Sequence, residues 1–142
     1  MSEHKLYYRF KPIGIDWSDE KEIKKHNLPL TSFECLSEQL FHLDSAYKNK
    51  TKDPADIIIN AVPEIWGVVE LHVCHQIGFK LLSRAVKTNC FSICISKIEF
   101  NEEMNMYYYD TEDFSEVRQI LQDFIENKKI PDLRKWKCEF VA

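Results

Sequence analysis

The chain switches between two hydrophobic periodicities, and this switching constrains its fold more than any other feature. Two segments repeat apolar side chains every three or four residues, as amphipathic helices do. A capping box, Thr31-x-x-Glu34, predicts the start of the first helix. The second helix is predicted over residues 111–127. The two stripes consist of Phe33, Leu36, Leu40, Leu43 and Tyr47, and of Phe114, Val117, Leu121, Phe124 and Ile125.

Four other segments are predicted to be strands: three alternate apolar and polar side chains, as a strand with one buried face does, and residues 106–109 form the return strand of a hairpin. They are residues 5–13, 90–100, 106–109 and 136–140, with a hairpin turn predicted at residues 101–105. The highly charged residues 16–27 predict a short surface helix. Asp53 and Pro54 form another helix-start signal, before the short apolar run at 55–62.

Residues 63–87 carry both periodicities. Val69, Leu71, Val73 and His75 alternate as a strand would, whereas Ile65, Val69, Val73, Ile77 and Leu81 recur every four residues. The segment is longer than an ordinary strand, and Pro63 suits the first position of a helix. A largely buried helix is therefore predicted here.

These elements predict one α+β domain over residues 1–142, with an antiparallel sheet of about four strands covered by several helices. A chain of 142 residues suits a single domain, which would hide roughly 68–70% of its unfolded surface. The hydrophobic share of 44% is too high for a disordered chain.

A cytoplasmic protein is expected. The first residues do not show the basic start and apolar run of a secretory signal. Residues 65–82 carry too many polar side chains to span a bilayer. The five cysteines are odd in number and lie within apolar patterns, which favours reduced, buried thiols over disulfides.

The sequence contains no familiar catalytic motif. It lacks G-x-S-x-G and H-E-x-x-H, and its three glycines are too scattered to form a phosphate-binding loop. A non-catalytic protein without a cofactor is therefore predicted.

One alternative is a small metal- or thiol-dependent enzyme that uses His72, Cys74, His75 and Glu70. These are zinc-ligand residue types, and on a helix His72 and His75 would share a face. No C-x-x-C pair supports the site, however, so buried thiols and a helical histidine are the preferred interpretation.

The strongest charge pattern is acidic. Residues 99–116 contain seven acids and no lysine or arginine, with two methionines and three consecutive tyrosines among them. Exposed aromatic side chains between carboxylates suit a surface that binds a basic protein, although a helix N-terminus also attracts acids. The predicted partner-binding residues are Glu99, Glu102, Glu103, Tyr107, Tyr109, Asp110, Glu112 and Asp113.

Basic residues surround Trp136 near the end of the chain: Lys128, Lys129, Arg134, Lys135 and Lys137. A helix C-terminus and an edge strand explain most of them. Because the net charge is −4, nucleic acid is not expected as the partner.

In its small size, acidity and lack of a signal segment, the chain resembles the bacterial immunity proteins of contact-dependent growth inhibition systems. That resemblance implies a protein that binds and neutralises a cognate toxin domain in the cytoplasm, frequently a cationic nuclease. It implies neither a membrane nor a nucleic acid as partner, and it assigns no site residues.

Overall fold

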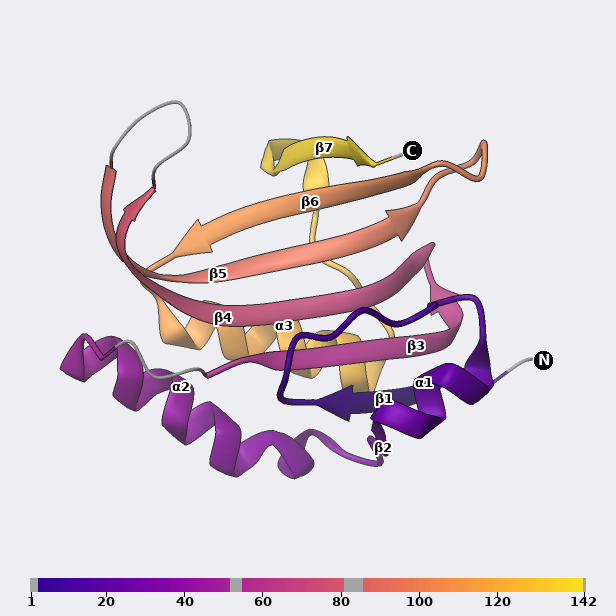
Figure 1. The fold of residues 1–142 in the computed structure, drawn as a ribbon, viewed down its shortest axis with the longest axis horizontal. Coiled ribbons are helices and arrows are strands. Elements are labelled where there is room, and N and C mark those ends of the chain that lie inside the picture. The colour runs from indigo at the N-terminus through magenta and orange to yellow at the C-terminus, as the bar shows by residue number, and fades with distance from the viewer. Residues whose placement is uncertain (1–2, 52–54, 81–85, 142) are drawn as a thin grey trace.

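The structure, a computed structural model, describes residues 3–51, 55–80 and 86–141. Within these residues, seven strands form one antiparallel sheet in the order β2-β1-β3-β4-β5-β6-β7 (Figure 1). The strands are β1 (Lys5–Arg9), β2 (Leu28–Pro29), β3 (Ile57–Ile65), β4 (Val68–Lys80), β5 (Val86–Ile98), β6 (Met104–Thr111) and β7 (Lys137–Val141). The same residues contain the helices α1 (Glu20–His26), α2 (Ser37–Asn49) and α3 (Phe114–Asn127).

The α+β class and the antiparallel sheet are confirmed, but the expected four strands are too few. The buried helix predicted over residues 63–87 is wrong. Its first part completes β3, Trp66 and Gly67 form a turn, and β4 follows, while residues 81–85 lie outside the described residues. Residues 57–62 also belong to β3, and Asp53 and Pro54 are not among the described residues. β4 pairs with β3 on one side and β5 on the other, so its backbone groups are satisfied as a central strand.

The helices predicted over residues 16–27, from Thr31 and over residues 111–127 all form, but each begins later than predicted, at Glu20, Ser37 and Phe114. Asp19 caps α1 by accepting from the Lys21 amide at 3.0 Å, and Asp113 caps α3 by accepting from the Ser115 amide at 3.0 Å. The Thr31–Glu34 capping box is wrong, because a 3₁₀ turn at Phe33–Leu36 precedes α2, which begins only at Ser37.

α2 and α3 cover one face of the sheet and bury its core, whereas α1 lies on the other face (Figure 1). The central strands contribute alternate residues to this core, as a strand with one helix-covered face should. The fully or almost fully buried side chains there are Leu36, Leu43, Ile57, Ile59, Leu71, Val73, Phe91, Ile93, Ile95, Val117, Leu121 and Phe124.

The opposite face is covered unevenly. The segment from Phe10 to Asn27, which includes α1, lies over β1 and β3, whereas no described helix covers β4, β5 and β6 on this side (Figure 1). Arg9 holds the segment in place, because its guanidinium donates to five acceptors within 3.3 Å. They are the carbonyl oxygens of Lys11 and Ile13, the side-chain oxygens of Asn27 and Asn60, and the Glu70 carboxylate.

None of the described helices is long and apolar enough to cross a membrane.

Candidate functional site

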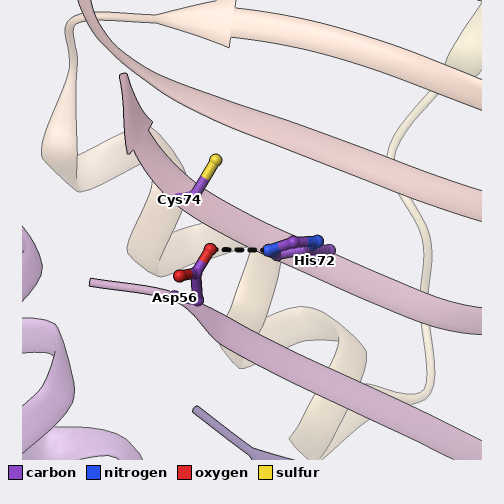
Figure 2. Close-up of side chains that lie close together, drawn as sticks. All are labelled: Asp56, His72 and Cys74. Atoms are coloured by element: carbon purple, nitrogen blue, oxygen red, sulfur yellow. Dashed lines mark hydrogen bonds and ion pairs between the residues drawn. The ribbon is translucent and has the colours of Figure 1, made fainter. Parts of the chain in front are cut away.

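Three potential metal ligands meet on the face of the sheet opposite α2 and α3. Asp56 directly precedes β3, and His72 and Cys74 lie two residues apart on β4, so both project from the same side of that strand (Figure 2). The His72 Nε2 atom lies 2.8 Å from Asp56 Oδ1. One ligand atom from each of the three residues lies within 4.8 Å of the other two.

The strand register explains why these side chains converge. Ile57 pairs with Val73 and Ile58 with His72, so Asp56 is brought opposite Cys74 and diagonally beside His72. The Gln39 side-chain amide donates to the Asp56 carbonyl oxygen at 3.2 Å, which fixes the backbone at the start of β3. The cluster is partly open to solvent, since the side chain of His72 is 27% exposed and that of Asp56 15%.

The Cys74 thiol is protonated at neutral pH. Burial raises its pKa to about 12, and the nearby Asp56 carboxylate adds to the shift. A neutral thiol is a poor nucleophile, so the cluster is poorly suited to thiol catalysis without a cation to stabilise the thiolate.

Cys94 and Tyr108 continue this row of side chains across β5 and β6. His72 is paired with Cys94, and Cys94 with Tyr108. Burial raises the pKa of Cys94 to about 11 and that of Tyr108 to about 12. A second half-buried thiol therefore lies opposite His72, but it is not one of the three converging donors.

Two other members of the predicted metal or thiol cluster lie elsewhere. His75 projects to the helix side of β4, where its Nε2 atom lies 2.6 Å from Asn89 Oδ1 and its ring contacts Tyr47 edge-on. Glu70 is held by Arg9 and Asn60. The expectation that His72 and His75 share a face is wrong, because side chains three positions apart on a strand point to opposite faces.

The six acidic residues among the eight predicted partner-binding residues fall into two groups at opposite ends of β6. Glu99, Glu102 and Glu103 lie at the β5–β6 turn, whereas Asp110, Glu112 and Asp113 lie at the far end of the strand. At 3.4 Å per residue, Glu103 and Asp110 are separated by roughly 24 Å. The acidic segment therefore does not form one continuous patch.

The far-end group has roles within the fold. Asp110 accepts from the Ser92 hydroxyl at 2.8 Å, Glu112 accepts from the Tyr47 hydroxyl at 3.3 Å, and Asp113 caps α3. Tyr109 stacks on Trp136 with ring centroids 5.1 Å apart and donates to Glu116.

The turn group differs. Tyr107, on the helix side of β6, donates to the Glu99 carboxylate, and this bond is the main reason that the pKa of Tyr107 is raised to about 12. Glu102 and Glu103 are exposed, and their carboxylates make no hydrogen bond or ion pair with any residue that the structure describes.

Sequence reasoning missed four residues of interest. Asp56 joins the metal-ligand cluster only through the β3–β4 pairing, and Trp66 and Phe100 are exposed aromatic residues at two turns. Cys35 is the fourth, since hydrogen bonds from Thr31 lower its pKa to about 7. The dipeptide Trp66–Gly67 was a usable turn signal, whereas nothing in the local sequence marks Asp56.

No protein-family model, curated protein or solved structure matches the chain. Its function therefore has to be inferred from the geometry of the described residues.

Proposed function

We propose that this chain is a non-catalytic binding protein that recognises a basic protein through the β5–β6 turn. One observation carries the proposal: Phe100 is fully exposed beside Glu102 and Glu103, two carboxylates that are unpaired among the described residues. An aromatic side chain supplies apolar contact area, while unpaired carboxylates attract and orient a cationic partner.

The turn is held in one conformation before any partner arrives. The Glu99 amide donates to the Glu103 carbonyl oxygen at 2.7 Å, and the Glu102 amide donates to the Glu99 carbonyl oxygen at 2.9 Å. Lys97 Nζ lies 3.0 Å from the Glu99 carboxylate, which also accepts from Tyr107. A turn that is already ordered loses little conformational entropy on binding, so more of the contact energy contributes to affinity.

The neighbouring β3–β4 turn adds a second aromatic side chain at the same end of the sheet. The Ile98 amide donates to the Gly67 carbonyl oxygen at 2.8 Å, which ties the two turns together (Figure 1). Trp66 is 73% exposed, and its Nε1 atom donates to the Lys128 carbonyl oxygen at 3.2 Å. Tryptophan is enriched among the residues that dominate binding energy, so Trp66 is a suitable second anchor.

A cationic toxin domain would suit this surface. The resemblance to immunity proteins of contact-dependent growth inhibition systems makes such a domain the preferred partner, neutralised stoichiometrically in the cytoplasm. The net charge of −4 would assist encounter with a basic protein over distances comparable to the Debye length.

The experiment uses site-specific photocrosslinking in the cells that produce the protein. p-Benzoylphenylalanine replaces Phe100, and the matched control replaces Phe41, a phenylalanine of α2 that is 71% exposed. A defined adduct with one basic protein is expected from position 100 and not from position 41.

The captured protein is then purified and titrated against the wild-type chain and against Phe100→Ala and Glu102→Lys/Glu103→Lys variants. The charge reversal should slow association, most strongly at low salt, whereas Phe100→Ala should speed dissociation. Identical adducts from both positions, or unchanged affinity in both variants, would refute this surface.

A further inference from the structure

We infer that Asp56, His72 and Cys74 form a binding site for a divalent zinc-class ion on the open face of the sheet. The inference is independent of the proposed protein-binding function. It rests on the convergence of three different metal-ligand side chains from two paired strands (Figure 2).

The donor set indicates the class of ion. A carboxylate oxygen, an imidazole nitrogen and a thiolate sulfur are the three ligand types that Zn²⁺ accepts, with bonds of about 2.0–2.3 Å. Calcium and magnesium prefer oxygen ligands alone, so a site with nitrogen and sulfur donors discriminates against them.

The spacing of the donors fits such an ion after small side-chain rotations. Ligand atoms bonded tetrahedrally to one zinc ion are separated by roughly 3.3–3.8 Å, given bond lengths of 2.0–2.3 Å. The His72 Nε2 and Asp56 Oδ1 atoms are now slightly closer, at 2.8 Å, and all three donor atoms lie within 4.8 Å of one another. The Asp56 Oδ1 atom therefore has to move away from His72 Nε2 by only about 0.5 Å for the ion to bind between them.

Charge balance favours the ion. The Asp56 carboxylate and a Cys74 thiolate would together neutralise a dication, so the occupied site carries no net charge in its half-buried position. On binding, the Cys74 S–H bond breaks, its proton passes to solvent, and sulfur bonds to the metal. Since the side chains of His72 and Asp56 retain some exposure, a fourth position faces solvent and can hold water.

The test uses cobalt(II) as a spectroscopic probe on the full chain, kept reduced by a phosphine. Titration should give one equivalent of bound Co²⁺ with a thiolate-to-cobalt charge-transfer band and the visible bands of a tetrahedral site. One proton should be released per ion from the thiol, detected with an indicator in weak buffer.

The variants separate this site from adventitious binding. Cys74→Ser should abolish the charge-transfer band, and Asp56→Asn and His72→Gln should weaken Co²⁺ binding at least about tenfold, the loss that even outer partners of ligands cause. The matched control is Cys94→Ser, which removes the other half-buried thiol of this face and should leave the band unchanged.

X-ray absorption of the zinc-loaded wild-type protein tests the site without any substitution. One sulfur neighbour of zinc at about 2.3 Å is expected. The inference is overturned if the wild-type protein shows no charge-transfer band, if the band survives Cys74→Ser, or if Cys94→Ser removes it as well. It is also overturned if no sulfur neighbour of zinc is found.

Discussion

Replacing Arg9 with methionine is expected to lower the free energy of unfolding by about 3 kcal/mol. Methionine keeps most of the apolar stem of Arg9 but removes all five N–H donors of the guanidinium. Asn60, which is completely buried, and Glu70 would then lose their cationic partner. Removing one member of a buried ion pair costs about 3–5 kcal/mol. We expect the lower end of that range, because the Glu70 side chain is 27% exposed and water can reach it.

The measurement is urea unfolding followed by circular dichroism at neutral pH, with Arg134→Met as the matched control. Arg134 also pairs with a carboxylate, that of Asp132, but both side chains are exposed, so its loss should produce no clear change. Adding Glu70→Gln to Arg9→Met should recover part of the loss, since it removes the stranded charge. Equal midpoint shifts for Arg9→Met and Arg134→Met would refute the idea that this network holds the N-terminal segment on the sheet.

Two further substitutions test the β5–β6 turn and its neighbour. Gly67→Ala should lower the melting temperature, because Gly67 has φ +85° and a Cβ there would lie 2.6 Å from the Ile98 carbonyl oxygen. The backbone conformation alone would cost an alanine about 1–3 kcal/mol. The control is Gly14→Ala, whose Cβ would meet nothing within 4 Å and should leave the melting temperature unchanged. Hydrogen bonding from Tyr107 holds the pKa of Glu99 below its ordinary value of 4.5. The stability contributed by the ionised Glu99 should therefore be present above pH 4.5 and fade as the pH falls through the lowered pKa of Glu99. The melting temperatures of the wild type and of Glu99→Gln should then converge in acid.

The helices that form could be predicted from the sequence because their signals are local. The stripe from Phe114 to Ile125 needs only the sequence around it, and Asp113 is a strong capping residue. The β5–β6 hairpin also has a local signal, but the turn predicted at residues 101–105 is displaced, because Met104 and Asn105 already pair with β5. These predictions hold because the packing of the folded chain favours the same local structure as the sequence signals do.

The error at residues 63–87 has a physical cause. Every fourth residue of a strand lies on one face, because four is twice the strand repeat, so the spacing of Val69, Val73 and Ile77 does not distinguish a helix from a strand. A helix also needs apolar residues three positions apart, and here Glu70 and Gln76 occupy such positions. Trp66 and Gly67, both with positive φ, make the turn that a helix would not contain.

That error also concealed the metal-ligand cluster. His72 and Cys74 could be found by residue type, but Asp56 is sixteen residues before His72 and joins it only when β3 and β4 pair. His75 was placed with His72 because helical spacing puts positions three apart on one face, whereas strand alternation separates them. A site that depends on the register between two strands cannot be predicted when one of those strands is predicted to be a helix.

The sheet separates the two proposed sites from the core and from each other. The core belongs to the helix-covered face, whereas Cys74 lies on the open face and Phe100 on a turn, so substitutions at either leave the main apolar cluster intact. Gly67, which lies in the turn tied to the β5–β6 turn, and Cys74 of β4 are seven residues apart, which is roughly 24 Å along the strand. Sites this far apart with no shared partner are normally additive. Cobalt affinity should therefore be unaffected by Phe100→Ala, and partner affinity by Cys74→Ser, so that failure of either proposal leaves the other open to its own test.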